Sequence, residues 1–174
     1  MIRTWKNDAP DSISPERLKE REIRDWLRRC RDMTQAEEDQ RDKIRRWKAA
    51  ATQTTQGVSG MPGGAGGKDK VGKTAARIID EESRLAHRED ISRKIKAEAY
   101  RRILWPLGND LHYTSRMVEY LEGYYIDCAS TDSHGRFQLV TYEQLAGRKG
   151  VEVSTVKKSM CRAVRILAQY WDAL

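Results

Sequence analysis

Apolar residues early in the chain recur at alternating steps of three and four, the spacing of one face of a helix packed against another helix. Ser14-Pro15-Glu16 suits the start of this helix, because it offers a cap, a proline at the first helical position and an acid in the first turn. The seam consists of Trp26, Cys30, Met33, Glu37, Gln40, Ile44, Trp47 and Ala51. We expect the polar members Glu37 and Gln40 to weaken the seam locally and to fix its register against a second helix or another subunit.

A glycine-rich segment separates this helix from a second one. Residues 52–70 hold six of the twelve glycines in a polar setting, which predicts a flexible loop. The second helix is predicted from Lys70 or Lys73 to Leu104, because Pro106 disfavours helical geometry at the residue before it. Its intermittent apolar face consists of Ile78, Leu85, Ile91, Ile95, Ala99 and Ile103. Residues 14–105 are therefore predicted to form a helical hairpin or coiled-coil arm, preceded by a flexible N-terminal arm over residues 1–13.

A third helix is predicted from a cap at Asn109 or Asp110 to about Asp127. Its apolar face consists of Leu111, Val118, Leu121 and Tyr125, widened by Met117, Tyr120 and Tyr124. Tyrosines could stack on bases, but at helical spacing they more often belong to a core. Residues 128–140 are interpreted either as a surface loop or as a small hairpin that ends in Phe137-Gln138-Leu139-Val140.

The last part of the chain has the pattern of a helix-turn-helix. Thr141 and Gln144 fit a capping box for its first helix. Ala146, Gly150 and Val156 have the spacing of the small residue, the turn residue and the branched packing residue of that motif. Ser154 is the candidate cap of the second helix. The apolar positions of that helix recur at three and four: Val153, Val156, Met160, Ala163, Val164 and Leu167.

Charge adds a candidate partner to this pattern. The chain has a net charge of +7, and six bases face one acid between Arg148 and Arg165, whereas residues 106–140 carry two bases and five acids. A locally basic helix suits a polyanion, so we predict binding to double-stranded DNA over residues 106–174. The residues predicted to enter the major groove are Thr155, Lys157, Lys158 and Arg162, and those predicted to contact the backbone are Arg148, Lys149, Ser154 and Arg165.

A family resemblance adds to this interpretation. The segment LAGRKGVEVSTVKKSMCRAVRIL resembles region four of bacterial sigma factors, through Leu145, Ala146, Gly150, Ser154, Thr155, Val156, Arg162, Ala163 and Leu167. The whole chain resembles small phage-encoded late-gene regulators of the ArpU and RinA groups, which also share the patterns at residues 60–64, 69–72 and 78–80. The resemblance implies an all-α fold, a sequence-specific transcriptional activator of phage late genes, and host RNA polymerase as a candidate partner in the host cytoplasm. Residues 128–140 are longer than the connection that sigma domains have here.

One motif matches a pattern of a different function, the binding of nucleotide phosphates. Residues 67–74, GKDKVGKT, match the Walker A string letter for letter. That motif binds phosphates only where a buried strand leads into its loop, and more glycine precedes this one. We therefore expect a solvated, basic helix start here.

Other residues indicate neither catalysis nor a bound cofactor or metal. Cys30, Cys128 and Cys161 are far apart, form no Cys-x-x-Cys and lack ligand spacing with the histidines, which favours reduced thiols in the cytoplasm. The paired carboxylates Glu81-Glu82 and Glu89-Asp90 lie on a charged helix, where a solvated surface is the expected reading. No apolar run has the length of a membrane span, and residues 1–10 lack a signal-peptide core, so we expect no membrane contact.

Two further functional classes fit the same sequence. A phage DNA-packaging subunit of the small-terminase kind also joins a helix-turn-helix to an oligomerising helical region. A scaffold or interaction protein could be built on the heptads alone. In each case the helical arm makes a homo-oligomer the expected state.

Overall fold

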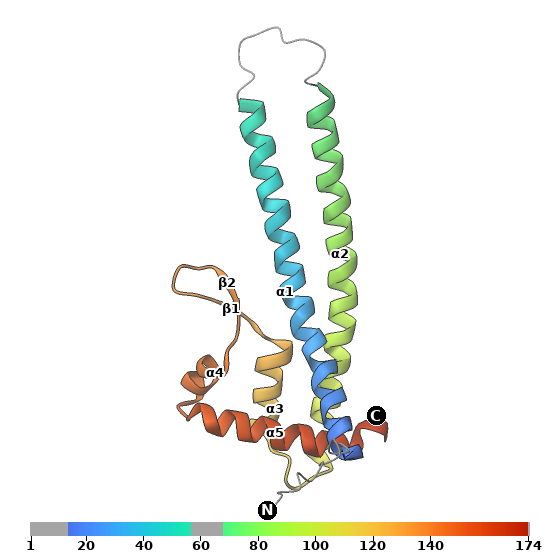
Figure 1. Ribbon diagram of the computed structural model, residues 1–174, viewed down its shortest axis with the longest axis vertical. Helices are drawn as coiled ribbons and strands as arrows, with labels where there is room; N and C mark the ends of the chain where they lie inside the picture. The colour runs from blue at the N-terminus through green and yellow to red at the C-terminus, as the bar shows by residue number, and fades with distance from the viewer. Residues whose placement is uncertain (1–13, 57–67, 174) are drawn as a thin grey trace, which may run out of the picture.

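The computed structural model describes residues 14–56 and 68–173, and it is predominantly helical, as the sequence predicted (Figure 1). The expected N-terminal arm, the glycine-rich residues 57–67 and the pattern at residues 60–64 lie outside the described residues. The helices are α1 (Pro15–Gln56), α2 (Lys68–Leu104), α3 (Ser115–Leu121), α4 (Tyr142–Lys149) and α5 (Val153–Tyr170). Shorter elements are η1 (Trp105–Gly108), the π-helical turn η2 (Glu122–Ile126), β1 (Ala129–Thr131), β2 (Phe137–Leu139) and η3 (Trp171–Ala173).

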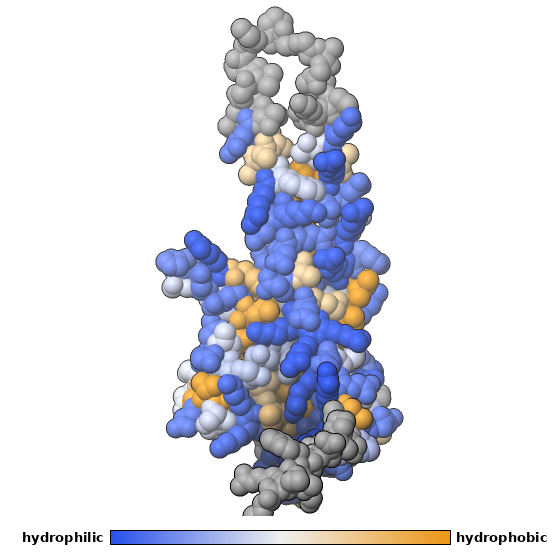
Figure 2. Space-filling view, viewed as in Figure 1, coloured by the Kyte–Doolittle hydropathy of each residue, from blue (hydrophilic) through white to orange (hydrophobic). Residues whose placement is uncertain are grey.

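Helices α1 and α2 lie side by side, and both run further than the sequence predicted (Figure 1). Helix α1 continues to Gln56 because no glycine or proline interrupts it before Gly57. The predicted seam of α1 is only partly correct: Cys30, Glu37, Gln40 and Ile44 are buried. In its first part Leu27 and Thr34 are buried in place of Trp26 and Met33, and Trp26 packs on Trp171, with ring centroids 5.2 Å apart. At Gln40 the partner of α1 is α2 of the same chain, one of the two alternatives that the sequence left open. The visible surface of the two helices is predominantly hydrophilic (Figure 2).

The polar members of the seam are buried. The side-chain nitrogen of Gln40 donates to the backbone carbonyl and to the carboxylate of Glu81 on α2. Among the described residues, Glu37 Oε1, Gln40 Oε1 and Ser92 Oγ have no hydrogen-bond partner. Ser92 is buried while Ile91, which was predicted to be on the apolar face, is 40% exposed. The prediction for Ile91 is wrong because the buried stripe runs through positions 92, 95, 99 and 103, one residue further along the helix.

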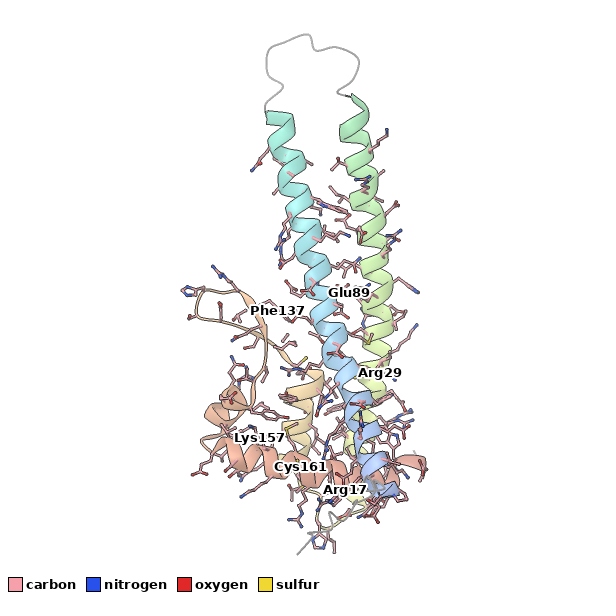
Figure 3. The ribbon with its side chains drawn as sticks, in the orientation of Figure 1. Arg17, Arg29, Glu89, Phe137, Lys157 and Cys161 are labelled. Carbon is pink, nitrogen blue, oxygen red and sulfur yellow. The ribbon has the colours of Figure 1, made fainter. Side chains whose placement is uncertain are left out.

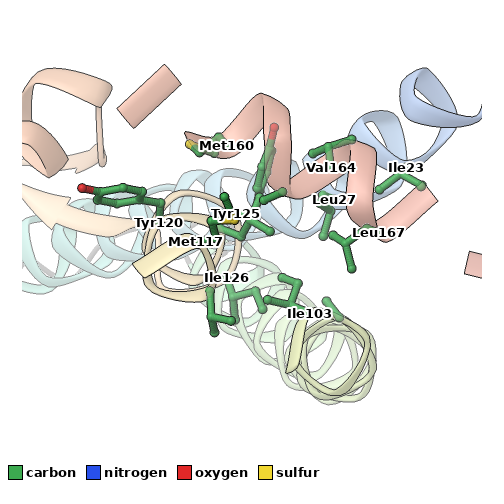
Figure 4. Packing of buried hydrophobic residues seen from close by; sticks show 14 of the residues in the cluster. Ile23, Leu27, Ile103, Met117, Tyr120, Tyr125, Ile126, Met160, Val164 and Leu167 are labelled. Atoms are coloured by element: carbon green, nitrogen blue, oxygen red, sulfur yellow. The ribbon is translucent and has the colours of Figure 1, made fainter. Parts of the chain in front are cut away.

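The lower ends of α1 and α2 share one hydrophobic core with α3, α4 and α5 (Figure 4). Ile23 and Leu27 of α1 meet Leu167 of α5 in this cluster, and Ile103 joins it from α2. Tyr120 and Tyr125 are buried in it, as the sequence predicted. The smaller group of helices is therefore joined to the long pair by burial of apolar side chains.

The third helix begins later than predicted. Asp110 caps no helix, because its carboxylate accepts the backbone N–H of His112 and forms a turn, and α3 starts only after Thr114. Leu111 lies in this turn and is fully exposed, so its predicted place on the apolar face is also wrong. Residues 128–140 adopt the hairpin alternative. Its strands pair antiparallel, and its tip is closed by Asp132, which accepts two backbone N–H groups at 2.8 Å.

Candidate nucleic-acid interface

Helices α4 and α5 are joined by a tight turn whose local signals are those the sequence predicted. The capping box is present: Thr141 Oγ1 accepts the N–H of Gln144 at 3.3 Å, and Gln144 Oε1 accepts the N–H of Thr141 at 3.0 Å. Gly150 has a left-handed backbone with φ of 62°, which glycine adopts without steric cost. The following Val151 N–H donates to Ala146 O at 3.0 Å and closes the end of α4.

The start of α5 differs from the prediction. Glu152, with an extended backbone, occupies the cap position, and Ser154 lies inside the first turn, where its hydroxyl hydrogen-bonds to Glu152 Oε2. The prediction of Ser154 as the cap is wrong because α5 begins two residues earlier than that prediction requires, at Val153. No side chain caps this helix among the described residues, and Ser154 faces solvent.

The two faces of α5 differ sharply. The inward positions Val156, Met160, Ala163, Val164 and Leu167 are buried, as predicted. On the opposite side the exposed residues are Ser154, Thr155, Lys157, Lys158, Cys161, Arg162 and Arg165. Figure 3 labels Lys157 and Cys161 of this set. Part of this outer face borders a hollow of about 420 Å³, where Lys158, Arg162 and Arg165 lie beside Asp110 and His112 of the turn before α3. The outer face therefore gathers positive charge along one helix.

Some of the eight residues predicted to contact DNA already have a partner within the protein, and others do not. Lys149 forms an ion pair with Glu119, Arg165 with Glu20 at 3.4 Å, and Arg148 donates to Ser130 at 3.4 Å. Lys157 lies over the ring of Tyr142. Within residues 14–56 and 68–173, the side chains of Lys158 and Arg162 form no ion pair and no hydrogen bond. Thr155 and Ser154 complete the exposed start of the helix.

Two glutamates in the segment before the hairpin have altered pKa values. The hydrogen bond from Lys149 lowers the pKa of Glu119, so that carboxylate stays charged and keeps its pair. Glu122, three residues further along, is partly buried and lies near Asp127 and Glu119. Burial, followed by these two charges, raises its pKa. The pKa values of these two carboxylates are thus shifted in opposite directions.

Sequence reasoning missed a contact between the long helices and this region. The guanidinium of Arg31 on α1 donates to the carbonyl oxygens of Tyr124 and Val140, both at 2.8 Å. These partners are 93 and 109 residues away along the chain, so no local pattern could have indicated them. Tyr142, the first residue of α4, stacks on Tyr124 with ring centroids 4.3 Å apart.

Other candidate chemistry is limited in the part of the chain that the structure describes. That part contains no group of three or more residues able to hold a metal ion, and no helix long and apolar enough to cross a membrane. Cys30 and Cys128 are buried, and burial raises the pKa of the Cys30 thiol to about 11. Residues 68–74 of the Walker-like string lie in the first turns of α2, and Gly67 lies outside the described residues.

Comparisons of the chain with protein families, with curated proteins and with solved structures found no match.

Proposed function

We propose that the protein is a sequence-specific DNA-binding transcriptional regulator, with α4 and α5 acting as a helix-turn-helix. The observation that carries the proposal is the two-sided character of α5. Its inner face is buried in the core, and its outer face presents Lys158 and Arg162 without an acidic partner among the described residues. A helix held rigidly on one side and basic on the other fits the major groove of DNA.

The proposed contacts follow from exposure and from present partners. Thr155, Lys158 and Arg162 are the candidates for base edges, because arginine and lysine donate to guanine and a hydroxyl can serve either base of a pair. Lys149 and Arg165 are assigned to phosphates. Their present ion pairs are at the surface, where such pairs contribute only about 0–1 kcal/mol, so a phosphate can replace the acid at small cost.

The remaining backbone contacts are assigned to Arg148, Ser154 and Lys157, which lie near the turn between α4 and α5. The sequence predicted Lys157 for the major groove, and we reassign it to the DNA backbone because its ammonium lies over the Tyr142 ring. Together with Lys149 and Arg165 the three residues surround the base-reading positions. Because phosphate contacts fix orientation and base contacts carry specificity, this division assigns each residue a separate measurable role.

The resemblance to sigma region four and to phage late-gene regulators extends the proposal to activation of late genes in the host cytoplasm, with host RNA polymerase as a partner. Helices α1 and α2 would then place the DNA-binding part relative to the polymerase or to another copy of the chain. Since α2 is the partner of α1 at Gln40, pairing of copies would use the outer surface of the arm.

Protection mapping of upstream DNA of the protein's own late operon tests the function directly. We expect a discrete protected site, and binding to about 4–6 phosphates predicts a log–log salt slope of roughly −4 to −5. Absence of protection on every fragment, or an affinity independent of salt, would overturn the proposal. A mass measurement that gave a ring of many subunits would favour a DNA-packaging subunit.

A further inference from the structure

Four side chains from four different elements lie in contact between the long helix α1 and the outer face of α5. The first is Arg31, whose guanidinium carbon lies 4.2 Å from the ring centroid of Tyr124. Its two hydrogen bonds join the guanidinium to the carbonyl of Tyr124 in η2 and to the carbonyl of Val140 at the end of the hairpin. Arg31 thereby holds η2 and the residue before the cap of α4 against α1.

The next members are two stacked rings. Tyr124 and Tyr142 are nearly parallel, at 13°, with centroids 4.3 Å apart. Arg31 and Tyr142 both contact the Tyr124 ring, which therefore links them. Tyr142 follows Thr141, the cap of α4, so the position of this ring is tied to the start of that helix.

The last member is Lys157 on the outer face of α5, whose ammonium lies 5.3 Å from the ring centroid of Tyr142. A lysine has a flexible stem of four carbons, and a freely moving lysine loses conformational freedom when it binds a phosphate. A cation held over an aromatic ring has lost part of that freedom beforehand. This geometry therefore favours a contact between Lys157 and a phosphate of the DNA backbone.

We propose that Arg31 is a positioning residue, which holds the ammonium of Lys157 in place for a DNA phosphate through the stacked rings of Tyr124 and Tyr142. The positioning is a property of the free protein, and its consequence for DNA rests on the proposed function. Arg31 itself contacts no DNA in this scheme. The arm is thus coupled to the affinity of the DNA-binding helix through one row of side chains.

The first test uses NMR of the full chain without DNA. Protons on the ε-carbon of Lys157, assigned by their loss in Lys157→Gln, should show an upfield ring-current shift. Tyr142→Phe keeps the ring and should keep the shift, while Tyr142→Leu should abolish it. Arg31→Lys, which retains charge but not the forked hydrogen bonds, should reduce the shift by about half or more.

The control variant in this test is Arg28→Lys, because Arg28 pairs with Asp25 on its own helix, and it should leave the Lys157 shift unchanged. An unaltered shift in Tyr142→Leu or in Arg31→Lys would overturn the positioning. If Arg31→Lys fails to fold, Tyr124→Leu against Tyr124→Phe tests the same link, since only the first removes a ring that Arg31 and Tyr142 both contact.

The second test is a double-mutant comparison of DNA affinity. Lys157→Gln should weaken binding about three- to tenfold in the wild-type background, as expected for one lost phosphate contact. In the Arg31→Lys and Tyr142→Leu backgrounds the same change should cost less than about twofold, because coupled residues are not additive. Arg162→Gln is the control: among the described residues the Arg162 side chain forms no hydrogen bond, ion pair or cation–π contact with a member of the row, so its loss should cost the same in all backgrounds.

The two proposals fail in different ways. Wild-type protein that binds no DNA overturns the proposed function and the DNA consequence, while the ring-current shift still decides whether Arg31 positions Lys157. Normal DNA binding with fully additive losses for Lys157→Gln and Arg31→Lys overturns the coupling and leaves the proposed function intact.

Discussion

The side-chain nitrogen of Gln40 hydrogen-bonds across the long helix pair to Glu81, at 3.1 Å to the backbone carbonyl and at 3.0 Å to the carboxylate. A buried polar residue in a mostly apolar seam stabilises one register, because a shifted pairing would leave it buried without partners. This contact connects α1 and α2 at a defined position of the helix pair.

We expect Gln40→Ala to lower the free energy of unfolding by about 1 kcal/mol, the usual net value of a buried hydrogen bond. Urea denaturation followed by circular dichroism measures this. Gln35→Ala is the control, because the Gln35 amide binds Asp39 on the same helix, and its effect should remain below about 0.5 kcal/mol. Equal losses for both variants would contradict a role of Gln40 in joining the helices.

Gly150→Ala should destabilise the protein by about 1–2 kcal/mol, because its left-handed backbone brings a Cβ atom too close to the following carbonyl. Gly147→Ala, three residues earlier within α4, should be neutral or stabilising by up to about 1 kcal/mol, since the added Cβ meets nothing within 4 Å. Thermal unfolding of the two variants provides the comparison. A loss at Gly147 as large as that at Gly150 would show that space, and not backbone conformation, limits this turn.

Glu122 and Glu119 should respond to pH in opposite directions. The pKa of Glu122 is raised in the folded protein, so folding favours its protonated form, and this contribution is lost as pH rises through the folded pKa. Glu122→Gln should therefore raise the melting temperature at pH 7 and have little effect at pH 4.

The pKa of Glu119 is lowered by Lys149, so its charge stabilises the fold above its ordinary pKa of 4.5, and that contribution is lost as pH falls through the folded pKa. Glu119→Gln should therefore lower the melting temperature at pH 7, and the loss should shrink at pH 4. Shifts of the same sign for both variants at pH 7 would contradict the assigned environments.

Arg162→Met and Lys149→Met should separate base reading from phosphate contact. The first should weaken binding to the protected site by about 1–3 kcal/mol and reduce discrimination against unrelated DNA. The second should weaken both kinds of binding equally and make the salt slope shallower by about one. Fluorescence anisotropy with specific and unrelated duplexes measures both. Arg93→Met, on α2 beside Asp90, is the control and should change neither quantity.

Several elements follow from short stretches of sequence because their causes are local. Ser14 and Pro15 begin α1, Pro106 accompanies the end of α2, and Thr141 with Gln144 caps α4. Each of these signals acts within about four residues, which is the reach of a helical hydrogen bond or a capping side chain. The apolar spacing of α5 likewise predicted its buried face.

Two predictions of helix caps are wrong because the same polar side chain can stabilise either a turn or the start of a helix. Asp110 was a suitable helix cap by composition, yet its carboxylate closes a turn with His112. Ser154 was a suitable cap as well, and Glu152 occupies that position. Short polar side chains stabilise turns and caps alike, so composition does not decide between them.

By itself, the sequence determined the predominance of helix and the basic outer face of α5. It also determined the helix pair α4–α5, with its capping box and its turn at Gly150. Only the tertiary structure decided which of these bases already have partners, through Glu119 for Lys149 and Glu20 for Arg165. It also decided that Arg31 holds Tyr124 against α1. Helix periodicity and capping depend on neighbours a few positions away, whereas these contacts join residues 30 to 145 positions apart, which only the packing of the helices brings together.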